Sequence, residues 1–184
     1  IKVKKSVALS GVPAGSTALS AVGGADLHYR GYSIKDLAAN CQFEEVAHLL
    51  VHGALPTQAQ LDTYKAKLKG LRGLSPQVKT VLEQLPATAH AMDVLRTGFS
   101  ALGAVTPEST KHTEAEARDI ADSMLAKTGS LLGYWHHFAN SGKRIEVETD
   151  DDSIGAHFLH LLHGEKPSAL WEKAMHASLV LYAE

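Results

Sequence analysis

Cysteine is almost missing from the sequence. Cys41 is the single cysteine among 184 residues. One thiol cannot form a disulfide within the chain, which excludes a disulfide-stabilised secreted scaffold and favours a reducing, cytoplasmic setting. No neighbouring residue marks Cys41 as a nucleophile, so we interpret it as a small buried thiol.

Long apolar runs are also missing. No segment approaches the roughly 20 apolar residues of a membrane span, and the first residues lack the apolar centre of a signal peptide. We therefore predict that the protein does not associate with a membrane. Because the sequence starts at Ile1 rather than at methionine, we expect further residues before it.

An excess of either charge is missing as well. The chain has 18 basic and 20 acidic residues, a net charge of −2, and its basic residues are not clustered beyond the KVKK segment at its start. This balance provides no general attraction for nucleic acid. The hydrophobic content of 45% instead indicates a globular chain with one core, or with part of a larger one.

The patterns that are present are mainly helical. Two short runs on either side of Gly23 to Asp26 predict a β-hairpin within residues 1–33. After Ser33 the apolar residues recur at helical spacing, and neither a repeat nor a domain boundary interrupts them. We therefore expect one mainly α unit, with helices near residues 34–40, 43–52, 58–71, 76–84, 90–104, 114–139, 154–163 and 168–184.

Several helix starts carry a capping signal. In the pairs Thr57/Gln60 and Thr113/Glu116, a hydroxyl and a later polar side chain can satisfy first-turn donors that have no partner within the helix. Gly53 is expected to end the helix over residues 43–52. These signals predict where the helices begin and end.

The last expected helix, over residues 168–184, has apolar residues around most of its circumference: Leu170, Trp171, Ala174, Met175, Ala177, Leu179, Val180, Leu181 and Tyr182. This distribution predicts a helix that is buried on several sides. No glycine, asparagine or proline follows Tyr182 to end the helix, so we expect the natural chain to continue beyond Glu184.

Histidine is plentiful, with 11 copies, and raises the question of a metal site. His157, His160 and His163 are spaced by three residues, and each such step turns about −60° around a helix. The three rings therefore fan apart instead of converging on one ion. We expect polar histidines on a helix face here.

A second group of histidines has a similar interpretation. His48 and His52 have i, i+4 spacing, but Leu49 follows His48, so the HExxH motif and its glutamate base are missing. With one cysteine and no obvious third ligand, we predict no metal site. His136 and His137 are interpreted in the same way.

The acidic run Asp150-Asp151-Asp152 stands directly before an expected helix. It could in principle bind a divalent cation. We favour a simpler interpretation, in which negative charge interacts with the dipole at the helix N-terminus and either Ser153 or Asp152 is the cap.

A family resemblance runs through four segments of the chain. They read GVPAGSTALSAV at 11–22, LHYRGYSIKDLAANCQFEEVAHLLVHGALPT at 27–57, HAMDVLRTG at 90–98 and TDDDSIGAHFLHLLHGEKPSALW at 149–171. Together they resemble the citrate synthase family, and within it the bacterial 2-methylcitrate synthases. The resemblance extends over essentially the whole chain.

The resemblance implies a fold as well as a family. It implies a mainly α, citrate-synthase-like multi-helical large domain with a short N-terminal β-hairpin, truncated before the catalytic portion. Residues 1–184 would then be the N-terminal part of that domain, with the hairpin region at 1–33 and helices at 34–184. We expect the complete protein to be a homodimer.

The resemblance also implies an activity. Members of this family condense an acyl-CoA with oxaloacetate, and the likeness implies propionyl-CoA, giving 2-methylcitrate and CoA in propionate catabolism. Ordinary citrate synthase, which uses acetyl-CoA, is the alternative within the family. No cofactor is expected, because the acyl-CoA is a substrate. An alternative from another class is a non-catalytic helical assembly module, if the natural chain ends at Glu184.

The chemistry of such a condensation defines the residues it needs. A carboxylate base removes a weakly acidic proton next to the thioester, a neutral histidine stabilises the enol, and a second histidine polarises the oxaloacetate carbonyl. In the family these groups lie beyond the point that matches Glu184, in a segment that starts with His-Glu-Phe-Asn. We therefore expect no catalytic residue within residues 1–184, and we expect this fragment alone to be inactive. Ala91 stands where the family has proline, which affects no chemistry.

Substrate-binding residues are not assigned by these patterns. Arginine can bind carboxylates or a coenzyme phosphate through two parallel hydrogen bonds. Arg30, in HYRGY, is the first candidate, while surface or interface pairing is expected for most of the others: Arg72, Arg96, Arg118 and Arg144. The glycine-bearing segment 11–15 does not match a phosphate-binding P-loop.

Overall fold

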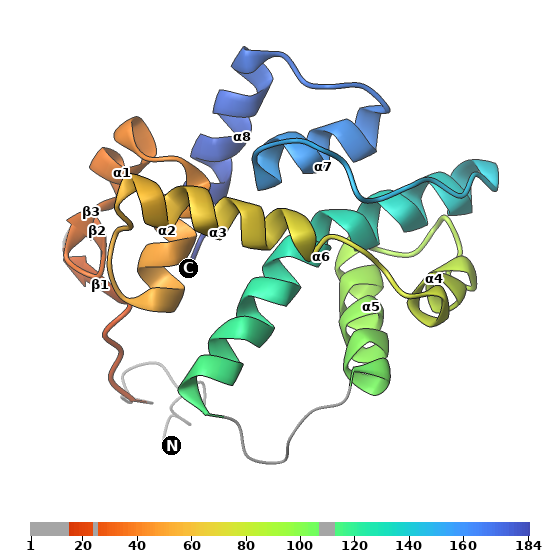
Figure 1. Cartoon of the computed structure of the whole chain (residues 1–184), viewed down its shortest axis with the longest axis horizontal. Helices are drawn as coiled ribbons and strands as arrows, with labels where there is room; N and C mark the ends of the chain where they lie inside the picture. Colours follow the sequence, from red (N-terminus) through yellow and green to blue (C-terminus); the bar gives the residue numbers. More distant parts are fainter. Residues whose placement is uncertain (1–14, 24–25, 107–112) are drawn as a thin grey trace, which may run out of the picture.

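The computed structural model describes residues 15–23, 26–106 and 113–184 (Figure 1). The described part begins with three short strands, β1 (Ser20–Gly23), β2 (Asp26–Tyr29) and β3 (Tyr32–Ser33). Helices follow to its end: α1 (Ile34–Asn40), α2 (Phe43–His52), α3 (Gln58–Gly70), α4 (Pro76–Glu83), α5 (Ala91–Val105), α6 (Glu114–Ser141), α7 (Ile154–His163) and α8 (Ala169–Leu181). The predicted mainly α class is confirmed, and every expected helix is present.

The small sheet confirms the predicted hairpin and extends it. β1 and β2 pair antiparallel, with Ser20 opposite Tyr29 and Gly23 opposite Asp26. The central turn residues, 24 and 25, lie outside the described residues, as do residues 11–14 of the glycine-bearing segment. The third strand, β3, was not predicted; it pairs with β2 through a turn in which Arg30 and Gly31 have φ values of 45° and 91°.

The predicted capping signals form the expected hydrogen bonds. At α3 the backbone N–H of Gln60 donates to the Thr57 hydroxyl, and at α6 that of Glu116 donates to the Thr113 hydroxyl. Gly53 ends α2 in the left-handed conformation, with φ of 94°. These bounds follow from local chemistry, because cap residues satisfy backbone groups that a helix leaves unpaired at its ends.

Two apolar clusters form the core, and α6 contributes to both. The first cluster joins the sheet to α1, α2, α3 and α8, and its buried residues include Tyr29, Leu37, Val46, Leu49, Leu68, Ala126 and Val180. The second joins α4 and α5 to the C-terminal half of α6, and its buried residues include Val78, Leu82, Val94, Leu131, Tyr134 and Leu161. In Figure 1 the long α6 runs between the two groups of helices. Helix α6 therefore connects the two clusters.

Helices α6 and α7 approach each other closely at two glycines of α6. A Cβ atom at Gly129 would lie 3.3 Å from the ring of His157, and one at Gly133 would lie 2.8 Å from Cβ of Leu161. The second distance is shorter than side chains tolerate, and its partner atom is fixed to the backbone. Gly133 therefore allows the contact between α6 and α7.

The substitution Gly133→Ala tests this contact. Alanine is the better helix former by about 1 kcal/mol, yet we expect the free energy of unfolding to fall by about 1–3 kcal/mol, because the new methyl group overpacks against Leu161. Gly103→Ala is the control, since no neighbouring atom of the described residues lies within 4 Å of its added Cβ. Urea unfolding of the full-length protein should show a loss for the first and a small gain for the second. Equal effects would contradict a packing role for Gly133.

Helix α8 leaves several apolar side chains exposed. Val180 is buried, but Leu170, Trp171, Leu181 and Tyr182 have exposed fractions of 50% to 87%. Within the described residues α8 packs against α1, α2 and α7, and in Figure 1 it stands between α1 and α7. Burial of α8 on several sides is an expectation for the complete protein and stays a prediction, because the described residues alone leave these apolar side chains uncovered.

Candidate functional site

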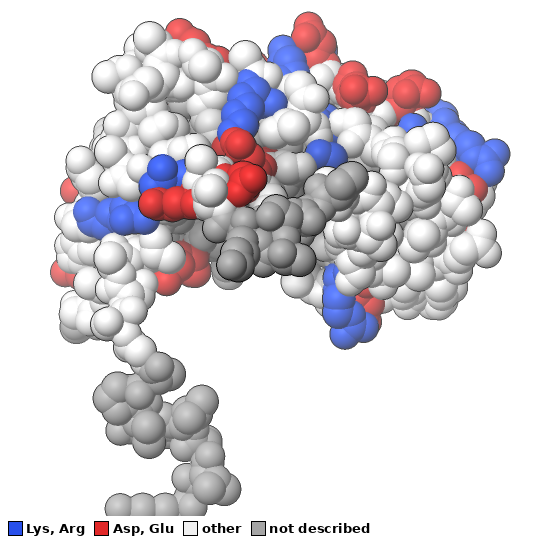
Figure 2. Space-filling model, turned by 60° about the horizontal axis from the view of Figure 1, so that its bottom comes forward, with Lys and Arg blue, Asp and Glu red and all other residues white. Residues whose placement is uncertain are grey.

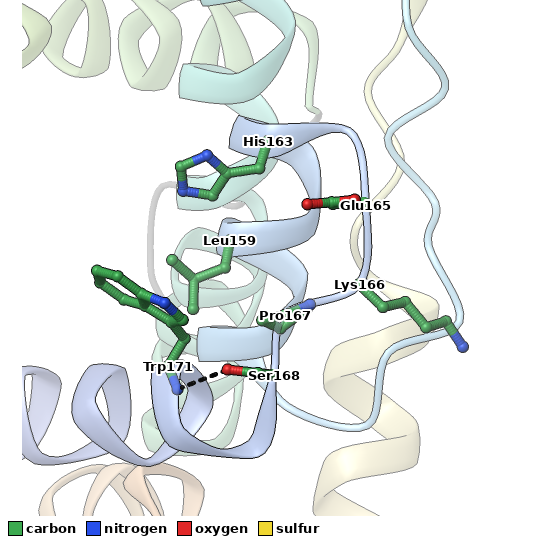
Figure 3. Close-up of a pocket in the computed structure, with 7 residues that line it drawn as sticks. All are labelled: Leu159, His163, Glu165, Lys166, Pro167, Ser168 and Trp171. Carbon is green, nitrogen blue, oxygen red and sulfur yellow. Dashed lines mark hydrogen bonds between the residues drawn. The ribbon is translucent and has the colours of Figure 1, made fainter.

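A hollow of about 580 Å³ lies where α7 leads into α8 (Figure 3). Its wall is formed by Leu159, His163, Glu165, Lys166, Pro167, Ser168 and Trp171. Figure 3 shows the rings of His163 and Trp171 on the same side as Leu159, while the ammonium group of Lys166 points away from them. The hydroxyl of Ser168 accepts the backbone N–H of Trp171 and so caps α8. The hollow thus has an apolar wall and diverging polar groups, which is no arrangement for nucleophilic or acid–base chemistry.

A buried arginine organises the segment between α6 and α7. Arg72 follows α3 and is 2% exposed. Its guanidinium group donates to the carbonyl oxygens of Thr149 (2.9 Å), Asp151 (2.8 Å) and Ser153 (3.2 Å). Burial lowers the pKa of this group, while the neighbouring Asp151 and Glu44 act in the opposite direction. Arg72 therefore fixes the backbone of the 149–153 segment and is not free to bind a substrate.

The acidic residues at this segment pair individually with basic ones. Lys69 donates to Asp150 at 2.9 Å, Lys65 donates to Asp152 at 2.6 Å, and the Asp151 carboxylate lies 2.7 Å from Nδ1 of His160. Of the two caps considered, Ser153 is the one used, because its hydroxyl accepts the N–H of Ala156. The three carboxylates thus diverge to separate partners and are not arranged around a common cation.

The three histidines of α7 fan apart as predicted. His163 lies at the exposed hollow and His160 at Asp151, but His157 is 1% exposed. Its ring lies between the hydroxyl groups of Ser130 (3.1 Å) and Thr149 (2.9 Å). The expectation of polar histidines on a helix face is therefore wrong for His157, because the close approach of α6 encloses it.

Burial lowers the pKa of His157 to about 3, and the charge of Arg72 adds to the effect. In the unfolded chain the pKa returns to 6.5. Below pH 6.5 His157 therefore binds a proton in the unfolded state but not in the folded state. As a result, the free energy of unfolding falls as the pH falls. Above pH 6.5 it contributes nothing to the pH dependence.

As the pH is lowered from 6.5 to about 3, we expect protonation of His157 to reduce the free energy of unfolding by up to about 1.4 kcal/mol per pH unit. Urea unfolding of the full-length protein at pH 7.0, 6.0 and 5.5 measures this slope. His157→Gln should flatten it, while His163→Gln, at the exposed hollow, should not. Parallel slopes for the parent and His157→Gln would show that His157 is not the titrating group.

His48 and His52 belong to a polar cluster between α2, α3 and α6. Their rings stack at 4.6 Å between centroids, and both meet the edge of Tyr64. The fully buried carboxylate of Asp122 accepts the Tyr64 hydroxyl at 2.8 Å and the Lys67 ammonium at 2.6 Å. Burial, followed by this hydrogen bond, raises the pKa of Tyr64. The carboxylate is already occupied, so the cluster is a structural connection between helices.

The remaining candidates also have structural partners. The guanidinium group of Arg30 donates to the carbonyl oxygen of Leu50 at 3.0 Å, which ties the β2–β3 turn to α2. Nε2 of His137 lies 2.7 Å from the carbonyl oxygen of Leu161, and His136 lies edge-on to His137. Cys41 is half-buried, and burial raises the pKa of its thiol, as expected of an unreactive cysteine. The arginines 96, 118 and 144 form surface ion pairs with Asp93, Glu114 and Glu83.

Charge is mixed over the surface as well. Figure 2 shows Lys and Arg beside Asp and Glu on the face drawn there. In the part of the chain that the structure describes, no three His, Cys, Asp or Glu side chains are grouped to hold a metal ion. None of the described helices has both the length and the apolar character needed to cross a membrane.

The buried structural roles of two residues, Asp122 and Arg72, were not predicted from sequence. Asp122 has a usable signal, because Ala126 and Gly129 follow it at i+4 and i+7 and all three face inward. Arg72 has none, since it lies outside a helix and its partners are backbone carbonyls some 80 residues later. Neither residue is joined to a nucleophile. The described residues thus provide a scaffold with buried polar connections.

Comparison with known proteins assigns this scaffold to a family. The family model described as "Citrate synthase, C-terminal domain" matches residues 8–184. The chain is 58% identical over 178 residues to 2-methylcitrate synthase of Shewanella oneidensis, covering 96% of this chain and 47% of that protein. It is 33% identical to citrate synthase of Acidithiobacillus ferridurans over 187 residues, covering 96% of this chain and 47% of that protein.

A solved structure agrees with the sequence relatives. It is the ternary complex of citrate synthase from Thermoplasma acidophilum with carboxymethyl coenzyme A and oxaloacetate, with a TM-score of 0.84 at 27% identity, covering 94% of this chain and 45% of that one. The chain spans about half the length of the relatives it matches. With a family model over nearly its whole length and a helical fold that superposes on a known member, this chain belongs to the citrate synthase family.

Proposed function

We propose that the protein containing this chain is a 2-methylcitrate synthase, which condenses propionyl-CoA, oxaloacetate and water to 2-methylcitrate and CoA. The observation that carries the proposal is the 58% identity to the Shewanella enzyme, well above the 33% identity to a citrate synthase. A role in propionate catabolism, in the cytoplasm and as a homodimer, belongs to the same proposal.

Within that enzyme, residues 1–184 form the N-terminal part of the large helical domain. The base, the enol-stabilising histidine and the oxaloacetate-binding histidine lie outside these residues. The support for this assignment is chemical: the buried histidine and carboxylates described above, His157, Asp122 and Asp151, are already engaged with partners inside the fold. Their role is to hold the helices and the 149–153 segment in place.

Substrate preference tests the proposal. One methylene in an apolar pocket changes selectivity by about 1–3 kcal/mol, or roughly 10–200-fold. We expect the full-length protein to prefer propionyl-CoA within this range, in kcat/KM measured at saturating oxaloacetate. Acetyl-CoA should remain a measurable substrate, because a pocket with room for the larger acyl group cannot exclude the smaller one.

The opposite preference has a definite meaning. If acetyl-CoA has the higher kcat/KM, the protein is a citrate synthase, the function that its 33% identity to the Acidithiobacillus enzyme supports as the second candidate. A protein that releases CoA with neither thioester would contradict a condensing function altogether.

A further inference from the structure

Three helices meet at a polar junction formed by side chains of α2, α7 and α8. The first residues of α2 and α7, Phe43 and Ile154, each have a backbone N–H that the helix itself leaves unpaired. Both find an acceptor on another helix. The Phe43 N–H donates to Nδ1 of His176 on α8 at 3.0 Å, and the Ile154 N–H donates to the carboxylate of Glu44 on α2 at 2.7 Å.

The Glu44 carboxylate is 1% exposed and has unused bonding capacity. Its Oε1 atom accepts the Ile154 N–H, while Oε2 is buried without a hydrogen-bond partner among the described residues. Nδ1 of His176 on α8 lies 3.8 Å from this oxygen. This distance is too long for a hydrogen bond, so the direct link between α2 and α8 at this point is the bond from the Phe43 N–H to His176.

The hydrogen bond from Phe43 specifies the form of His176. Because a backbone N–H can only donate, Nδ1 must accept, and the ring proton is assigned to Nε2. Nε2 faces Oε1 of Glu172 at 3.7 Å, one turn earlier on α8. The same Glu172 oxygen accepts the hydroxyl of Ser153, the cap of α7, at 2.6 Å.

These contacts form a closed path from α8 to α2, from α2 to α7, and from α7 back to α8. The helices α7 and α8 also approach each other closely, since a Cβ atom at Gly155 of α7 would lie 3.1 Å from the side chain of Met175 of α8. Beyond the junction, Val180 of α8 is buried in the first core cluster beside Tyr29 and Leu37. The junction and this apolar contact attach α8 to the rest of the fold at two points. Together they determine the direction in which the backbone leaves the C-terminal end of α8.

We propose that His176 is a positioning residue, which uses its Nδ1 acceptor to hold the C-terminal end of α8, and thereby the active-site segment that follows it, in a productive orientation. The inference rests on the proposed function, which assigns the catalytic histidines to the part of the enzyme after α8. His176 itself touches no substrate in this assignment.

The test compares three variants of the full-length protein. His176→Leu removes the acceptor, and His176→Asn restores it, because the Asn side-chain oxygen occupies nearly the position of Nδ1. Val78→Ala, in the second core cluster, is the control for lowered stability without a change at α8. For each variant kcat and KM are measured well below its melting temperature, and hydrogen exchange is measured for the amides of residues 177–184.

We expect His176→Leu to lower kcat by about 10- to 100-fold with little change in KM, as small misplacements of reacting groups do. The amides of residues 177–184 should exchange about tenfold faster or more. His176→Asn and Val78→Ala should both stay within about threefold of the parent in kcat and exchange. Loss of kcat in Val78→Ala equal to that in His176→Leu, or unchanged exchange in His176→Leu, would overturn the inference.

Failure of the proposed function is a separate outcome. A parent protein that condenses neither propionyl-CoA nor acetyl-CoA would contradict the proposed function. The hydrogen-exchange measurement would then test the inference by itself. Faster exchange confined to residues 177–184 in His176→Leu, and restored to the parent rate in His176→Asn, supports the positioning of α8 by His176. Any other pattern overturns it.

Discussion

Residues 1–184 alone are expected to release no measurable CoA from propionyl-CoA and oxaloacetate. The proposed base and both proposed active-site histidines lie outside this segment, and groups that act as a unit lose nearly all of their effect when they are removed together. We expect a rate at least about 10³-fold below that of the full-length enzyme. The assay follows thiol release at saturating oxaloacetate.

The length of the assayed chain has to be verified by mass spectrometry, because traces of full-length enzyme would mimic activity. Full-length protein at one-thousandth of the concentration is the positive control. Turnover comparable to that of the full-length enzyme would mean that the site has been assigned to the wrong half. His48, His52, His157 and His160 would then become the candidates for catalysis.

Removal of the Arg72 guanidinium group should produce the largest loss of stability. In Arg72→Met the side chain keeps its apolar length, but the carbonyl oxygens of Thr149, Asp151 and Ser153 lose their common donor. Buried groups left unpaired cost about 1–3 kcal/mol each, and breaking a buried charged connection costs about 3–5 kcal/mol in total. We expect the free energy of unfolding of the full-length protein to fall by about 3–5 kcal/mol.

Arg144→Met is the matched control. Arg144 also uses two guanidinium hydrogen bonds, at 2.7 and 2.8 Å, but its partner is Glu83 and its side chain is exposed. Exposed ion pairs contribute about 0–1 kcal/mol, so its loss should be small. Urea unfolding followed by circular dichroism compares the two. Equal losses would show that burial and the three carbonyl partners do not distinguish Arg72.

The helices could be located from sequence because their ends depend on neighbouring residues. Thr57 and Thr113 formed their predicted caps, Gly53 ended α2, and the β1–β2 hairpin formed on either side of Gly23 to Asp26. The β3 strand was missed, since two residues carry no periodic pattern. The fan of His157, His160 and His163 was predictable as well, because it follows from the angle between successive helix positions.

The environment of each side chain was decided by the tertiary structure. The α7 helix pattern does not reveal that His157 is enclosed by Ser130 and Thr149, because those partners come from α6 and from a segment without regular structure. Arg72 was expected at a surface or interface, and it is buried because the carbonyl oxygens of residues 149–153 converge on it. Cys41, by contrast, has the half-buried environment of an unreactive thiol, in keeping with its isolation in the sequence.

By itself the sequence determined the mainly α class, the helix bounds and, through four segments of resemblance, the citrate synthase family. These follow from local hydrogen bonding, from periodicity and from residue identity, which a linear chain already contains. The tertiary structure alone decided which polar groups are buried and paired, from Arg72 and His157 to the junction of Glu44 and His176. Several of these pairs join residues that are 27, 110 and 133 positions apart, and their energy depends on burial that exists only once the helices have packed.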